Sequence, residues 1–185
     1  MKKIIITAIV LVSIIVPLAI LGGRQVQTLW AGCQFIPGSM ENKSAAEIER
    51  AALDYACANF KSANAPRVRL NRRISPKEFM TFFGGSNDFC QDQKLALVIL
   101  EGDFESLNTL SPLRKPPSTK FVGLLFNLRL GEPIDITGSK TGEGFAEILN
   151  DPSLPPRTSQ LAPVPEKLPA CMYGQIAPTV MPPNR

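Results

Sequence analysis

Three carboxylates alternate along residues 101–105, where Glu101, Asp103 and Glu105 follow a short apolar run. Successive side chains of a strand point to opposite faces, so an extended chain would project all three from one face as a row. Paired carboxylates can hold Ca²⁺ or act as a general acid and base. Gly102 interrupts the row, and carboxylates after a buried run are also typical of a solvated strand end. We prefer the solvated strand end and retain the row as a candidate site.

Three arginines, Arg67, Arg69 and Arg73, fall on one face of a predicted strand over residues 67–74, because polar and apolar residues alternate there. Guanidinium groups can bind a phosphate or an anionic headgroup through paired hydrogen bonds. No aromatic residue is interleaved with them. The pattern therefore favours a solvated edge strand, whose charges discourage pairing with another chain. The opposite face of the strand is predicted to carry Val68, Leu70 and Ile74.

Histidine is absent from all 185 residues. This excludes Ser-His-Asp and Cys-His catalysis, the H-E-x-x-H zinc helix and the 2-His-1-carboxylate iron site within this chain. We therefore expect a binding protein rather than an enzyme, with no metal or cofactor. The alternative is a small carboxylate- or metal-dependent enzyme that uses the row at 101–105.

Residues 4–21 form an uncharged apolar segment of 18 residues, preceded by Lys2 and Lys3. As a helix rising ~1.5 Å per residue it would span about 27 Å, close to the ~30 Å of a bilayer core. The preceding lysines place the N-terminus in the cytoplasm and the rest of the chain outside. We predict a transmembrane signal anchor over residues 1–23. A cleaved signal peptide that releases a secreted module, or a lipid on Cys33, are the open alternatives.

The chain has 20 Lys and Arg against 16 Asp and Glu, a net charge of +4. Once the two lysines before the anchor are set aside, 18 basic and 16 acidic side chains remain. Such a balance, without a cluster, indicates no nucleic-acid partner. We expect the bilayer to contact residues 4–21, and the outer part to bind another envelope or extracellular protein.

Four cysteines, Cys33, Cys57, Cys90 and Cys171, follow the predicted anchor. An even number outside the cytoplasm predicts disulfides, and four cysteines allow three pairings. We prefer Cys57–Cys90, which would tie a long helix to the loop before a buried strand, together with Cys33–Cys171. The alternative for Cys57 is a reduced, buried thiol that packs as a small apolar side chain.

Capping signals predict two helices. Ser44 and Glu47 form a capping box that opens an amphipathic helix reaching about Ser62. Ser75, followed by Pro, opens a shorter helix that runs through Phe83 and ends at a Gly-Gly pair. The long helix has an apolar face that must pack on a partner surface.

Strands are predicted over residues 94–100, buried on both faces, and over the hairpin formed by 119–130 and 134–137, with a last helix at 143–149. The fold class is therefore α+β, with the long helix packed on an antiparallel sheet in the manner of cystatin-like or related rolls. A linker over 24–39 and a domain over 40–150 follow the anchor. The tail over 151–185 is predicted to be extended or disordered, since residues 152–185 contain nine of the 17 prolines.

Overall fold

The computed structural model describes residues 33–62, 64–84, 89–106 and 118–171. The predicted anchor and residues 172–185 lie outside this part of the chain. Within the described ranges no helix is both long enough and apolar enough to cross a membrane. The prediction of a transmembrane segment at 4–21 thus remains a prediction from sequence.

Helix α2 (Ala45–Asn59) begins as its capping box predicts, because the Ser44 hydroxyl accepts from the Glu47 backbone and the Glu47 side chain accepts from the Ser44 backbone. Its buried side chains, Ile48, Ala52 and Ala56, are spaced four apart and form one stripe. The helix ends at Asn59 rather than near Ser62, because the next residues leave it to form a strand of the sheet. Tertiary pairing therefore replaces the last predicted turn.

Five antiparallel strands form one sheet. They are β1 (Phe60–Ser62), β2 (Arg67–Ile74), β3 (Leu95–Ser106), β4 (Ser118–Asn127) and β5 (Glu132–Ser139). Strands β1 and β2 pair with successive parts of the same side of β3, β4 pairs with its other side, and β5 lies at the far edge. The 12 residues of β3 make it the central strand.

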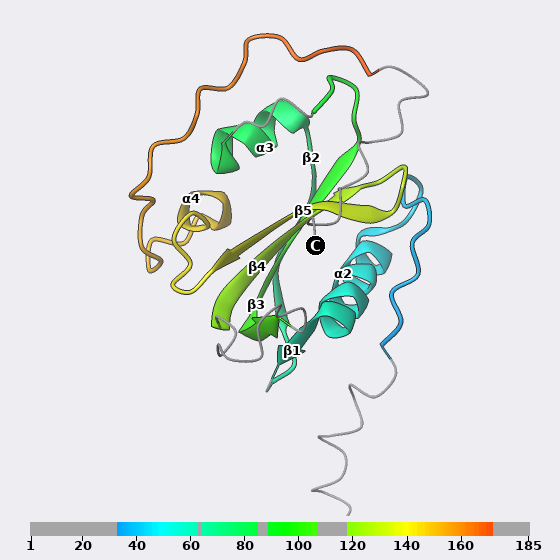
Figure 1. Cartoon of the computed structure of the whole chain (residues 1–185), viewed down its shortest axis with the longest axis vertical. Helices are drawn as coiled ribbons and strands as arrows, with labels where there is room; N and C mark the ends of the chain where they lie inside the picture. The colour runs from blue at the N-terminus through cyan, green and yellow to red at the C-terminus, as the bar shows by residue number, and fades with distance from the viewer. Residues whose placement is uncertain (1–32, 63, 85–88, 107–117, 172–185) are drawn as a thin grey trace, which may run out of the picture.

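Helices lie on both sides of this sheet, with α2 on one side and α3 (Pro76–Phe83) and α4 (Ala146–Leu149) on the other (Figure 1). Residues 95–100 of β3 are at most 1% exposed. Side chains of the strands that pack with α2 include Val98, Leu100, Leu124 and Phe126; those on the opposite face include Leu97, Ile99, Phe121 and Leu125. Full burial of one such side chain contributes about 1.5–3 kcal/mol. The predicted α+β class and the doubly buried strand are confirmed, and α3 and α4 add a second covering layer.

Helix α3 begins and ends where its sequence signals place it. The Ser75 hydroxyl accepts from the Glu78 backbone, Pro76 occupies the first turn, and the chain leaves the helix at Gly84 with a φ of 90°. A left-handed residue of this kind strongly favours glycine. Ile74 and Phe79, on either side of the cap, are both buried in the core between the sheet and α3.

A register shift in β2 overturns the predicted faces of this strand. Val68 lies opposite Leu100 and Leu70 lies opposite Ile99, so Arg69 is an extra residue between two consecutive pairs. Such a bulge resets the alternation of side chains. Val68 consequently packs on the α2 side and Leu70 on the α3 side. The prediction that both face one way, with three arginines opposite, was wrong.

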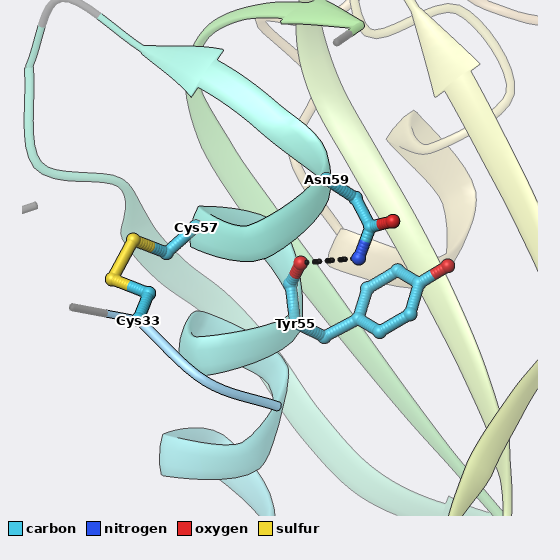
Figure 2. The surroundings of a disulfide bond; sticks show 4 residues. All are labelled: Cys33, Tyr55, Cys57 and Asn59. Carbon is cyan, nitrogen blue, oxygen red and sulfur yellow. Dashed lines mark hydrogen bonds between the residues drawn. A yellow bond between two sulfur atoms is a disulfide. The ribbon is translucent and has the colours of Figure 1, made fainter. Parts of the chain in front are cut away.

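All four cysteines form disulfide bonds, as predicted, but the predicted pairing was wrong. The bonds are Cys33–Cys57 and Cys90–Cys171, with Cα atoms 5.8 and 4.9 Å apart. Cys57 points away from the sheet toward the segment before α2 (Figure 2). Cys90 follows Phe89, which is buried on the opposite face of the sheet. The sheet therefore separates Cys57 from Cys90, and the alternative of a reduced Cys57 was also wrong.

The C-terminal segment over residues 152–171 contains no helix or strand and runs along the outside of α4 and α3 (Figure 1). Leu154, Val164 and Leu168 pack on the core beneath it. Its backbone also joins the loop before β3, where the Gln91 N–H donates to the Pro169 carbonyl over 2.9 Å. An extended, proline-rich segment thus completes the second covering layer.

The disulfide pairing predicts a specific thiol count. The Cys57→Ser/Cys90→Ser variant removes one cysteine from each bond, so we expect two free thiols in protein oxidised in its native compartment. A matched Cys90→Ser/Cys171→Ser variant should show no free thiol, although losing its bond should lower the free energy of unfolding by about 4 kcal/mol. Thiol titration in denaturant measures both. A bond between Cys33 and Cys171 in the first variant would contradict the structure.

Candidate functional site

Arg69 forms the centre of a cluster of charged side chains on the α3 and α4 side of the sheet. Its Nη1 lies 2.5 Å from Glu101 Oε2, and its Nη2 lies 2.7 Å from Asp151 Oδ2. Lys120 Nζ lies 3.5 Å from the other oxygen of Glu101. The Arg69 guanidinium also lies 6.0 Å from the centroid of the Phe121 ring. The cluster joins β2, β3 and β4 to the segment that follows α4.

The hydrogen bonds in this cluster keep its carboxylates ionised. The hydrogen bond from Arg69 lowers the pKa of Glu101, and the same contact raises the pKa of Arg69. Asp151 also has a lowered pKa, first because Ser153 donates to it and then because Arg69 does. A carboxylate already engaged by cations is a poor proton donor and a poor Ca²⁺ ligand. These contacts suit the cluster to a structural role, in which it links β2, β3 and β4 to the segment after α4.

The predicted carboxylate row does not act as one set. The β3–β4 register shifts between Glu101 and Phe104, so the alternation is interrupted within the row. Glu101 belongs to the Arg69 cluster, whereas Asp103 is exposed and Glu105 lies opposite Ser118. Among the residues that the structure describes, no group of three acidic or cysteine side chains is placed to hold a metal ion.

The three predicted arginines also separate. Arg69 enters the cluster above, while Arg73 donates to the backbone carbonyls of Glu41 and Lys43, just before α2. Arg67 is exposed at the start of β2. An arginine that the sequence did not single out, Arg72, lies 2.8 Å from Glu78 and over the Phe82 ring of α3. The arginines of β2 thus fasten the covering layers on both faces of the sheet.

The largest apolar exposure in the described ranges is near β5. Four large apolar side chains are well exposed there and in the segment before α2: Ile36 (70%), Leu130 (47%), Ile136 (45%) and Ile134 (38%). The backbone of Gly38 lies so close to Gly131 that a Cβ on Gly131 would be 1.8 Å from the Gly38 oxygen. The segment carrying Ile36 therefore lies beside the turn that carries Leu130.

We call strand β5 with Ile134 and Ile136 the β5 edge. In the described part of the chain, no strand pairs with the outer side of β5. Exposed polar backbone together with exposed apolar side chains is a template for another strand. The sequence predicts a returning strand here, over residues 134–137, but its exposure was not predicted. Pro133 was the available signal, because proline within a strand indicates an edge.

At the opposite side of the sheet, side chains of β2 contact both covering layers. The Asn71 amide donates to the Ala45 carbonyl of α2 over 2.7 Å, and Arg69 reaches the segment after α4. Side chains of β2 thus link it to both covering layers, while β5 has no comparable side-chain contact among the interactions described. The β5 edge is consequently the candidate binding surface.

Removing the Arg69 guanidinium should lower stability in a pH-dependent way. Because the folded pKa of Glu101 is lowered, its contribution is present above the unfolded pKa and is lost as pH falls through the folded pKa. We expect Arg69→Met to lower the free energy of unfolding by about 1 kcal/mol at pH 7, with the difference from wild type shrinking toward pH 2. Urea denaturation of the detergent-solubilised full chain measures this difference.

Arg67→Met is the matched control, because it removes the same charge from an exposed position of the same strand. It should change stability little at either pH. Equal losses in the two variants, or an Arg69→Met difference that persists unchanged in acid, would contradict a stabilising role for the cluster.

Comparison with protein-family models, with curated proteins and with solved structures finds no match to this chain. No function is therefore carried over from a relative. The cystatin-like roll remains our interpretation of the architecture, and the function has to be argued from the chain's own surfaces.

Proposed function

We propose that this chain is a single-pass membrane-anchored protein that presents a small, non-catalytic binding or assembly domain outside the cytoplasm. The observation that carries the proposal is the β5 edge, where Ile134 and Ile136 stay exposed on a strand whose outer side is unpaired in the described structure. The other large apolar side chains of the sheet are mostly buried. The exposure of Ile134 and Ile136 next to each other on β5 therefore favours a binding surface there.

Two observations support the location outside the cytoplasm. Both disulfides are formed in the folded domain, and disulfides persist in oxidising compartments. Lys2 and Lys3 precede the apolar segment at 4–21, an arrangement that orients a signal anchor with its C-terminal side outside. The first described residue, Cys33, follows this segment closely, which would hold the domain near the membrane surface.

The state of the polar candidates supports binding rather than catalysis. Glu101, the first carboxylate of the predicted row, is held by Arg69 and Lys120, and Arg69 is itself held by two carboxylates. These groups stabilise the fold, whereas the β5 edge offers backbone hydrogen bonds and apolar side chains. Such an edge suits an extended polypeptide, so the partner we propose is another envelope or extracellular protein.

Topology mapping of the full chain tests this proposal. A C-terminal reporter that is active only outside the cytoplasm should be active, and one that is active only inside should be silent. The protein should remain in the membrane fraction at alkaline pH, with residues 1–23 present in its mature N-terminal sequence.

The same reporters on a variant with Lys2 and Lys3 replaced by Glu provide the control, since orientation should then become mixed. Activity of the wild-type chain with the cytoplasmic reporter would overturn the proposed orientation. A mature chain that begins after residue 23 and is found in the medium would instead establish a secreted module.

A further inference from the structure

We propose that the partner of the β5 edge is an amphipathic extended polypeptide, with apolar side chains on one face and lysine or arginine on the other. This segment of another envelope or extracellular protein would pair with β5 as an added strand. The inference rests on the proposed function and deepens it, because it names the chemistry of the partner for the same surface.

The register between β4 and β5 places the side chains of β5 on the two faces of the sheet. Residues directly opposite each other in an antiparallel pair share a face. Ile136 lies opposite Leu124, which packs in the core beneath α2. Asp135 lies opposite Leu125, which packs in the core that includes residues of α3 and α4. Ile136 is therefore on the α2 face and Asp135 on the α3 face.

The bulge at Ile134 keeps Glu132 and Asp135 on one face. Glu132 lies opposite Asn127, and Asp135 lies opposite Leu125. These two residues of β4 are two positions apart, so their side chains point to the same face of the sheet. The α3 face of the β5 edge therefore carries two carboxylates.

Both carboxylates are available to a partner. Glu132 is exposed and Asp135 is half-buried, and within the described ranges neither takes part in an ion pair or a side-chain hydrogen bond. Glu101 on β3 differs, because Arg69 and Lys120 hold it. Opposite charges on neighbouring strands stabilise a strand pair. Two carboxylates without a cation thus favour a partner strand that carries cationic side chains on this face.

The α2 face of the β5 edge favours apolar side chains in the partner. Ile136 is 45% exposed there, although Leu124 beside it is buried, and Ile134 at the bulge is also exposed. An added strand would cover Ile136 with a side chain of its own on the same face. Successive side chains of a strand point to opposite faces, so the partner needs alternating apolar and cationic residues.

Three labelled synthetic peptides of about eight residues test this chemistry with the detergent-solubilised full chain. One alternates valine and lysine, the second alternates valine and glutamate, and the third contains the residues of the first in two blocks. We expect fluorescence anisotropy to show the tightest binding for the alternating lysine peptide. The other two should bind about fivefold more weakly, because glutamate repels the carboxylates and the block sequence cannot present two different faces.

Methylated amides test whether the peptide pairs as a strand. The backbone N–H groups of alternate residues point to the same edge of a strand, so methylating all valine amides blocks one edge and methylating all lysine amides blocks the other. We expect one of these two methylated lysine peptides to lose binding and the other to retain it.

Charge reversal on the protein supplies an independent measurement. Glu132→Lys combined with Asp135→Lys should reverse the preference, so that the glutamate peptide binds more tightly than the lysine peptide. Asp103→Lys combined with Glu166→Lys is the matched control, because it makes the same change of charge at exposed positions outside β5. The control should keep the preference for the lysine peptide.

A pair of apolar substitutions tests the other face. Ile136 and Leu130 are similarly exposed, at 45% and 47%, but only Ile136 lies on the strand. Ile136→Ser should weaken binding of the lysine peptide, and Leu130→Ser should leave it unchanged. Thermal unfolding should be close to wild type in both variants, which establishes that a loss of binding is not a loss of fold.

The proposed partner chemistry would be overturned by a glutamate or block peptide that binds as tightly as the alternating lysine peptide, or by a folded chain that binds none of them. Equal effects of the two serine substitutions, or of the two methylated peptides, would overturn it as well. These outcomes leave the membrane topology untouched, since topology is measured separately. Conversely, a cytoplasmic domain would overturn the proposed function, while peptide binding in detergent would still report on the β5 edge.

Discussion

Burial of β3 on both faces is the constraint on which the rest of the structure depends. Its apolar residues alternate between two cores, so the sheet needs one cover of α2 and another of α3, α4 and the C-terminal segment. Each disulfide fastens one cover: Cys33–Cys57 holds the segment before α2 against that helix, and Cys90–Cys171 holds the C-terminal segment beside the loop before β3. A domain with little regular structure in its second cover gains stability from such a crosslink.

Charged side chains connect β2 to the covering layers, whereas β5 exposes apolar side chains. The arginines of β2 reach both covers, through Arg69 to Asp151 and through Arg73 to the backbone before α2. Strand β5 instead exposes Ile134 and Ile136 and carries two charged residues, Glu132 and Asp135. The exposed apolar side chains of β5, on a strand whose outer side is unpaired in the described structure, are the physical basis for a binding surface there.

Local signals predicted the elements well, because capping and alternation act over a few residues. The Ser44 capping box, the Ser75 cap, the glycine that ends α3 and the doubly apolar run of β3 all appear as expected. The candidate sites fared differently. Two register shifts, at Arg69 and between Glu101 and Phe104, redirected the arginines and carboxylates, since one extra residue moves the following side chains to the other face.

The sequence by itself determined where α2 and α3 begin, which strand is buried on both faces and that the cysteines form disulfides. The sequence also predicts a membrane anchor over residues 4–21, which lie outside the described part of the chain. Only the tertiary structure decided which cysteines pair. Cys57 and Cys90 are consecutive cysteines in the sequence, but they lie on opposite sides of the sheet. The tertiary structure likewise decided that Arg69 and Glu101 hold the fold together and that β5 is exposed. Bulges, edges and covers depend on contacts between distant segments, and spacing along the chain does not encode them directly.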